Sequence, residues 1–296
     1  MPSLLTHKDL ETLAHELGHA VHGFVRGDTR DVPRDFIEIP SILAENWVHD
    51  PRILQKLSSH YTYENEAYLQ AWKSSNLDKA TPPKKAAASI FDAIAFNHHP
   101  GNQILHYQNL LWQSKFDLMV HSYSEEELKT ADLGVDCRKI LSEWTGIFGA
   151  ADAKLGSGKN NTYLRWTILN GYQTSTYCYA LAMVYTVDIF NKFFPRDLLN
   201  RKQGLRFRKI VLEHRDYFKS NIARDEFKKN PIRRFKLFIE LWMQGRSEST
   251  MDALEKFMAK KLSDKAFIKS LNASMRKAPK SRNKGFWTRV RDRLGM

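Results

Sequence analysis

The chain has few of the features that mark secreted, membrane-spanning or disulfide-stabilised proteins. Only 2 cysteines, Cys137 and Cys178, occur in 296 residues, which argues against a disulfide framework and fits a reducing compartment. The longest apolar run, 178–190, is interrupted by Asp188 and is too short to cross a bilayer. No basic segment followed by an apolar one opens the sequence, so we expect no secretory signal. The composition predicts a soluble intracellular protein without membrane contact.

Acidic residues are in the minority, and this bears on nucleic-acid binding. Lys and Arg number 46 against 33 Asp and Glu, which gives a formal net charge of +13. The basic residues gather in 201–209, 228–236 and 256–293, with aromatic residues between them, but no recognisable nucleic-acid-binding module accompanies them. We therefore expect a solvated basic surface and no nucleic-acid partner, with a phosphate-binding face as the alternative.

Strand-like alternation of polar and apolar residues is nearly absent, whereas helical periodicity recurs along the chain. The sequence therefore predicts a mainly α fold with little β structure. The segment 155–161 (LGSGKNN) is the most loop-like internal stretch and could separate two lobes or line a cleft. Besides a helix near the N-terminus, helices are predicted at 42–48, 51–57, 63–77, 85–95, 104–123, 125–148, 163–194, 195–213, 231–243 and 250–260.

The first predicted helix lies between an N-cap at Thr6 and a stop at Gly27. Apolar residues recur along one of its faces, in the stripe Leu10, Leu13, Leu17, Val21 and Phe24. A stripe of this kind is expected to face the protein core. His15, His19 and His22 fall together on a different face of the same helix.

The pattern H-E-x-x-H stands in the middle of this helix, as His15-Glu16-Leu17-Gly18-His19. Two histidines four residues apart lie on one face, so both imidazoles can point at one cation. Glu16 lies about 100° around the helix from His15, beside the metal without being forced to bind it. A base in that place can take a proton from an attacking water molecule. The pattern predicts a zinc site with His15 and His19 as ligands and Glu16 as general base.

Zinc held by two imidazoles needs a third protein ligand and an open coordination position. The segment 35–47, DFIEIPSILAENW, follows the helix closely and is acidic, then helical. It offers Asp35, Glu38 and Glu45, and spacing alone does not choose between them.

Four further residues can be interpreted from their positions. Glu45 could orient one of the metal-binding histidines by accepting its second ring proton, or it could be a solvated helix residue. His22 could lie just outside the metal ligands, with a surface or packing role as the alternative. His98 and His99 come directly before Pro100, fit no ligand spacing, and are interpreted as loop residues.

HELGHAVH followed by DFIEIPSILAENW resembles the zinc oligopeptidases, the family of thimet oligopeptidase, neurolysin, saccharolysin and mitochondrial intermediate peptidase. In that family the HExxH helix is followed by a D-F-V-E-x-P-S-Q-x-x-E-N-W-like stretch, whose first Glu is the third zinc ligand. The resemblance implies that Glu38 is this ligand, in a multi-helical, gluzincin-like zincin catalytic domain with one zinc ion. It also implies a monomeric metalloendopeptidase acting on short peptides, in the cytoplasm or, alternatively, in mitochondria.

The resemblance continues in patches downstream. Segments 115–121, 204–213 and 251–271 are similar to family segments, and 171–190 (GYQTSTYCYALAMVYTVDIF) resembles G-Y-D-A-x-Y-Y-x-Y. In the family the first and last of these tyrosines, matched by Tyr172 and Tyr179, contact the substrate and help polarise the scissile carbonyl.

The sequence also departs from the family. Thr167 stands where the family has a histidine, and the loss of one oxyanion donor typically costs on the order of 100-fold to 1,000-fold in rate. Gln173 and Thr176 replace a family Asp and Tyr.

The resemblance covers only the C-terminal catalytic part of the family. Family members are longer, and their N-terminal half supplies one wall of the substrate channel. We predict a catalytic domain over 1–275 and a basic tail over 276–296, with Arg215–Gln244 dividing the last helices as a surface insertion or as translated intron. A catalytically impaired pseudo-peptidase, or a fragment that keeps the zinc site, is the alternative to an active enzyme.

Overall fold

The computed structural model describes residues 6–27, 32–146, 172–213 and 248–277. All regular structure in these ranges is helical, which confirms the prediction of a mainly α fold. None of the described helices combines the length and the apolar character needed to cross a membrane. The elements are α1 (His7–Arg26), α2 (Arg34–Ile37), α3 (Ile39–Val48), α4 (Pro51–Leu57), η1 (Tyr61–Tyr63), α5 (Glu66–Ser75), α6 (Ala88–His98), η2 (Pro100–Asn102), α7 (Ile104–Val120), α8 (Glu125–Thr130), α9 (Leu133–Thr145), α11 (Tyr177–Phe193), α12 (Arg201–Phe207), the π-helical η4 (Arg208–Leu212), α15 (Glu248–Met258) and α16 (Lys265–Lys277).

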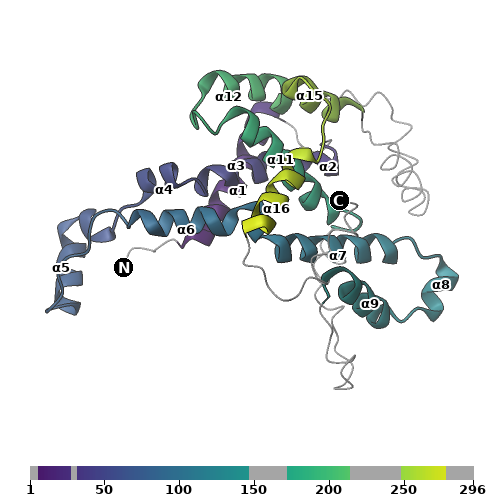
Figure 1. Ribbon diagram of the computed structural model, residues 1–296, viewed down its shortest axis with the longest axis horizontal. Helices are drawn as coiled ribbons and strands as arrows, with labels where there is room; N and C mark the ends of the chain where they lie inside the picture. Colours follow the sequence, from purple (N-terminus) through teal and green to yellow (C-terminus); the bar gives the residue numbers. More distant parts are fainter. Residues whose placement is uncertain (1–5, 28–31, 147–171, 214–247, 278–296) are drawn as a thin grey trace.

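The helices are arranged around a central group made of α1, α2, α3 and α11 (Figure 1). Helices α12 and α15 lie on one side of this group, and α7, α8 and α9 lie on the other. Helices α4, α6 and α5 extend away from the centre as an arm (Figure 1). The central group therefore holds the HExxH helix between the other parts of the fold.

The main hydrophobic core packs α2 and α3 against α11, η4 and α15. Its fully buried side chains include Phe36, Ile39, Ile189, Leu254 and Phe257. The indole N–H of Trp47 donates to the carbonyl of Leu198 at 2.7 Å, which attaches the end of α3 to the segment before α12. A smaller cluster between α7 and α9 contains Trp112, Phe116, Cys137 and Ile140. The main core and the Trp47 hydrogen bond fix α3, so α3 can act as a support for α1.

Helix α1 begins and ends where the sequence predicts. Thr6 is its N-cap and forms a capping box with Asp9, whose carboxylate accepts from the Thr6 backbone N–H at 2.8 Å. Gly27 is its C-cap, with a φ of 82° that disfavours side chains with a Cβ.

The face that α1 buries is the opposite of the one expected. The stripe is open to solvent, with exposed fractions of 48% for Leu13, 53% for Leu17, 49% for Val21 and 88% for Phe24. The inward face instead carries Ala14, Gly18, His22 and Arg26. The expectation of a buried apolar stripe was wrong because packing against α3, and not the apolar pattern, orients this helix.

Gly18 explains how α1 approaches α3 so closely. A Cβ at this position would lie 2.5 Å from the carbonyl oxygen of Pro40 and 2.6 Å from the Cα of Ser41. Only glycine allows this contact, since real Cβ atoms do not approach backbone atoms so closely. The close contact brings His15 and His19, which flank Gly18, next to the first turn of α3.

Several predicted helices were too long, including the one predicted at 195–213, which begins only at Arg201. The helix predicted at 125–148 is divided into α8 and α9, because Asp132 caps the second by accepting from the backbone N–H groups of Gly134 and Val135. Helix α11 begins only at Tyr177, after a turn in which Thr174 has a φ of 58°. The loop 155–161, Thr167, the predicted helix 231–243, the segment 215–244 and residues 278–296 lie outside the described residues.

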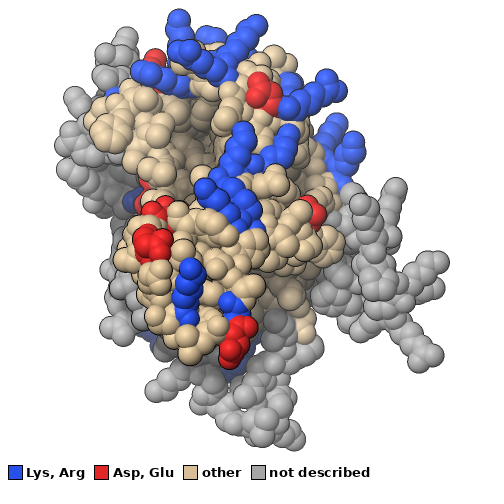
Figure 2. All heavy atoms as spheres, turned by 90° about the vertical axis from the view of Figure 1, so that its left-hand side faces the viewer, with Lys and Arg blue, Asp and Glu red and all other residues tan. Residues whose placement is uncertain are grey.

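Charged side chains are spread over the surface. On the face shown in Figure 2, Lys and Arg lie in several separate groups, with Asp and Glu and uncharged residues between them. This view shows no single continuous basic patch among the described residues.

Candidate metal centre

Two helices bring the histidines of the HExxH pattern and a downstream glutamate together. His15 and His19 project from the same side of α1, with ring centroids 4.9 Å apart and ring planes at 82°. Glu38 stands at the junction of α2 and α3, and its Oε2 lies 3.3 Å from Nε2 of His15 and 3.3 Å from Nε2 of His19. One ligand atom from each of the three residues lies within 4.8 Å of the others. Two imidazoles and one carboxylate around a common point match the donor set of a catalytic zinc site.

The carboxylate of Glu38 is buried and held in place. The hydroxyl of Ser41 contacts its Oε2 at 3.0 Å and its backbone carbonyl at 2.9 Å. Burial alone would raise the pKa of Glu38, but hydrogen bonds from His15, His19 and Ser41 outweigh burial and hold this pKa below its ordinary value. The group is therefore a carboxylate at neutral pH, as a metal ligand must be.

His15 lies between two carboxylates. Its Nδ1 is 2.6 Å from Oε1 of Glu45, while its Nε2 faces Glu38. Burial lowers the pKa of His15, yet hydrogen bonds to Glu38 and Glu45 raise it to about 10. The same negative field that holds a proton so strongly would also attract a metal cation to this point.

His22 is on the same face of α1 but points into the protein. It is buried, its ring meets Phe36 edge-on at 5.5 Å, and its Nε2 has no hydrogen-bond partner among the described residues. Burial, then the positive charges of Arg26 and His19, lower its pKa to about 4. The ring is therefore neutral and packed against Phe36.

Tyr172 and Tyr179 lie on the Glu38 side of the site. A cavity of about 270 Å³ is lined by His19, Glu38 and Tyr172, among other residues. Tyr179 packs against the main core, and burial, then the charge of Glu38 and a hydrogen bond with Tyr172, raise its pKa. Glu16 is exposed on α1 between the two histidines. Asp35 and Glu45, the competing candidates for third ligand, are not among the residues that meet at this point.

Sequence reasoning missed Asp117. This residue lies on α7, far from Tyr172 along the chain, and supports the turn that follows Tyr172. Its buried carboxylate accepts from the backbone N–H of Thr174 at 3.0 Å and of Thr176 at 3.3 Å. These bonds hold the turn that connects Tyr172 to α11. The predicted similarity of 115–121 to a family segment was the only signal that pointed to it.

His98 was also misinterpreted. It is the last residue of α6, not a loop residue, and its Nε2 lies 3.8 Å from Oε2 of Glu11 on α1. The available signal for this group was the spacing of His7 and Glu11, because residues four apart share a helix face.

A helical fold that presents an HExxH helix beside a buried glutamate is the arrangement typical of HExxH metallopeptidases. A family model described as "Peptidase family M3" matches residues 1–214, and the chain belongs to this family. The resemblance inferred from the two motifs is thereby confirmed. The match includes His15, His19, Glu38, Tyr172 and Tyr179, and it ends before 251–271, whose similarity stays a prediction.

Curated relatives are similar at modest identity. Oligopeptidase PhomG of Diaporthe leptostromiformis is 29% identical over 222 residues, which cover 71% of this chain and 31% of that protein. Saccharolysin of Saccharomyces cerevisiae is 26% identical over 235 residues, which cover 76% of this chain and 29% of that protein. Mitochondrial intermediate peptidase of Rattus norvegicus is 26% identical over 220 residues, which cover 72% of this chain and 27% of that protein. The chain thus spans about a third of the length of these relatives.

Proposed function

We propose that this chain is a zinc-dependent endopeptidase that hydrolyses short peptides. The observation that carries the proposal is the convergence of His15, His19 and Glu38, with Glu16 between the two histidines on the same helix. The family membership supports peptidase activity, and the names of the relatives include an oligopeptidase.

The donor set fits zinc. His15 and His19 would supply Nε2 atoms and Glu38 a carboxylate oxygen, which leaves one position of a tetrahedral site for water or substrate. Bound zinc would lower the pKa of a water molecule and polarise the peptide carbonyl. Glu45 would keep the His15 ring in orientation by accepting its Nδ1–H, as carboxylates commonly do beside metal ligands.

The protein side chains would carry the proton and hold the substrate. Glu16 would take the proton of the attacking water and deliver it to the leaving amine nitrogen. Tyr179, whose pKa is raised by burial, keeps its hydroxyl proton at neutral pH and would donate to the developing oxyanion. Tyr172, in the cavity beside His19 and Glu38, would contact the substrate.

We further propose a monomer that acts on peptides in the cytoplasm, with mitochondria as the alternative location and without nucleic-acid partners. The relatives are consistent with either place, since one of them is named a mitochondrial peptidase.

A catalytically impaired protein that keeps the zinc site is the second candidate. It is favoured by the exposed apolar stripe of α1, where Phe24 has 88% of its surface open and Leu17 has 53%. Apolar area of this kind usually packs against something, so the described residues provide less than a complete substrate channel around Glu16.

Zinc content and cleavage of a quenched fluorescent peptide by the purified chain test both candidates, with Glu16→Gln as the matched control. Bound zinc with cleavage that disappears in the variant is the expected result. Zinc in both proteins without cleavage in either would favour the impaired protein. Folded chain that binds no zinc at His15, His19 and Glu38 would overturn the proposal.

A further inference from the structure

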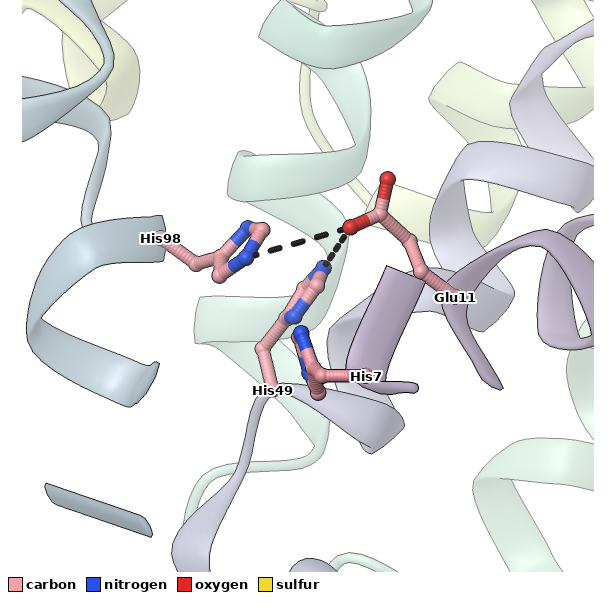
Figure 3. Close-up of side chains that lie close together, drawn as sticks. All are labelled: His7, Glu11, His49 and His98. Carbon is pink, nitrogen blue, oxygen red and sulfur yellow. Dashed lines mark ion pairs between the residues drawn. The ribbon is translucent and has the colours of Figure 1, made fainter. Parts of the chain in front are cut away.

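A second group of ligand-type side chains lies on the other side of Glu45 from the HExxH site. His7 and Glu11 come from the first two turns of α1, His49 directly follows α3, and His98 ends α6 (Figure 3). One potential ligand atom from each of the four residues lies within 4.8 Å of the others. Three separate segments of the chain thus place three imidazoles and one carboxylate around one point.

The distances within the group are too long for hydrogen bonds and suit a shared cation. Oε2 of Glu11 lies 3.9 Å from Nε2 of His49 and 3.8 Å from Nε2 of His98 (Figure 3). Ligand atoms of a tetrahedral zinc ion, at about 2.0–2.1 Å from the metal, are roughly 3.4 Å apart. A tilt of the stacked His49 and His98 rings, together with a small contraction, would bring both nitrogens and the oxygen to coordination distance.

The imidazoles of His49 and His98 present lone pairs and not positive charges. The rings of His49 and His98 are stacked at 3.6 Å and 12°, and that of His7 lies 5.2 Å and 5.1 Å from them. Burial, then the neighbouring His98, His7 and Lys8, lower the pKa of His49 to about 3. Burial likewise lowers the pKa of His98. Neutral imidazole is the form that binds metals.

The hydrogen bonds around the group leave ligand capacity unused. Nε2 of His7 is 3.0 Å from the carbonyl of Val48, so a ring that donates there presents the lone pair of its Nδ1. Nδ1 of His49 is buried and has no partner among the described residues. Lys8 pairs with Oε1 of Glu11, which leaves Oε2 facing the rings. Oε2 of Glu11 and the Nε2 atoms of His49 and His98 thus face one another without a hydrogen bond between them.

We propose that His7, Glu11, His49 and His98 form a second site for a divalent transition-metal cation, distinct from the site of His15, His19 and Glu38. Imidazole and carboxylate donors suit Zn²⁺ and the neighbouring first-row divalent ions better than Mg²⁺ or Ca²⁺, which prefer oxygen-only sets. The two sites share no ligand. The group lines a cavity of about 410 Å³, through which a cation can enter.

The test counts zinc ions bound per chain after gel filtration has removed excess Zn²⁺. Wild type is expected to retain two ions, and His98→Ala and Glu11→Gln one each. His15→Ala/His19→Ala should also retain one, and adding His98→Ala to this pair should remove it. His106→Ala, which removes an imidazole from the same cavity outside the group, is the matched control and should retain two.

These variants separate the second site from the proposed peptidase site. If the HExxH site binds no zinc, His15→Ala/His19→Ala will retain as much as wild type while His98→Ala loses an ion. Equal zinc in wild type, His98→Ala and Glu11→Gln would overturn the proposal, as would a folded His15→Ala/His19→Ala protein without zinc. His98→Gln replaces His98→Ala if the latter does not fold. Added Zn²⁺ should raise the Tm of His15→Ala/His19→Ala and leave that of the triple variant unchanged.

Discussion

Oε1 of Glu45 lies 2.6 Å from Nδ1 of His15, across the contact between α3 and α1. This contact fixes the ring so that its Nε2 faces Glu38. Residues that orient metal ligands in this way typically contribute 10-fold to 100-fold in metal affinity. Glu45 also lines the cavity of the second histidine group, so it lies between the two sites.

Glu45→Ala is expected to weaken zinc binding at the HExxH site by about 10-fold to 100-fold, because the His15 ring loses its acceptor. Glu45→Gln should weaken it less, since the amide oxygen can still accept from Nδ1–H. Affinity is measured by competition with a chromophoric chelator, in a His98→Ala background so that one site is followed. Equal affinities in Glu45→Ala and its parent would show that Glu45 does not support the site.

Two glycines inside helices should respond oppositely to alanine. Gly18→Ala places a methyl group 2.5 Å from a backbone oxygen of α3, and we expect a loss of about 1–3 kcal/mol in the free energy of unfolding. Gly204, in α12, has no atom within 4 Å of such a methyl group. Gly204→Ala should therefore stabilise the chain by about 0.5–1 kcal/mol through helix propensity.

Urea denaturation followed by far-UV circular dichroism measures both changes. Gly18→Ala should also lower zinc affinity, because moving α1 away from α3 separates His15 from Glu38. A Gly18→Ala protein as stable as Gly204→Ala would mean that α1 does not contact α3 as described.

The sequence was most informative where structure depends on residues close together along the chain. The cap at Thr6, the stop at Gly27 and the shared face of His15 and His19 follow from backbone hydrogen bonding and the helical repeat. Two linked motifs also pointed to Glu38, which the structure brings to both histidines. These features need no knowledge of how helices pack.

Features that depend on helix packing could not be obtained in this way. The apolar pattern of α1 predicted the wrong buried face, because the close contact at Gly18 is a property of α1 and α3 together. His98 meets Glu11 only through the folding of α6 against the start of α1, and no spacing rule links two such distant positions. Periodicity indicates that a helix forms and leaves open what it contacts.

Asp117→Ala should destabilise the turn that carries Tyr172. The substitution leaves the backbone N–H groups of Thr174 and Thr176 without their acceptor, at a position where Thr174 already has a φ of 58°. We expect the free energy of unfolding to fall by about 2–3 kcal/mol. Zinc affinity should change little, because no metal ligand contacts this carboxylate.

The control for Asp117 is Asp132→Ala, which removes an exposed N-cap of α9 and should cost about 1 kcal/mol. Urea denaturation and chelator competition are measured for both variants. If the peptidase proposal holds, Asp117→Ala should also lower kcat/KM while Asp132→Ala leaves it unchanged. Equal loss of stability in the two variants would contradict the special role of the buried carboxylate.

The stability of the chain should fall between pH 6.5 and about pH 4 because of His22. Its pKa is about 4 in the folded protein and near 6.5 when exposed, so the unfolded chain takes up a proton first as the pH falls. Proton uptake by the unfolded chain therefore favours unfolding between pH 6.5 and about pH 4. Below about pH 4 both states bind the proton, and His22 lowers the stability no further. A shift of this size corresponds to a loss of about 3 kcal/mol.

His22→Leu should remove this part of the pH dependence, since leucine cannot titrate and Nε2 has no described partner to lose. The free energy of unfolding is measured in urea at pH 7, 5.5 and 4.5 in the presence of a chelator. Other groups, including His15 and Glu38, titrate alike in both proteins, so the difference between wild type and variant isolates His22. The variant should lose less stability on acidification, and parallel curves would show that His22 is not held neutral by burial.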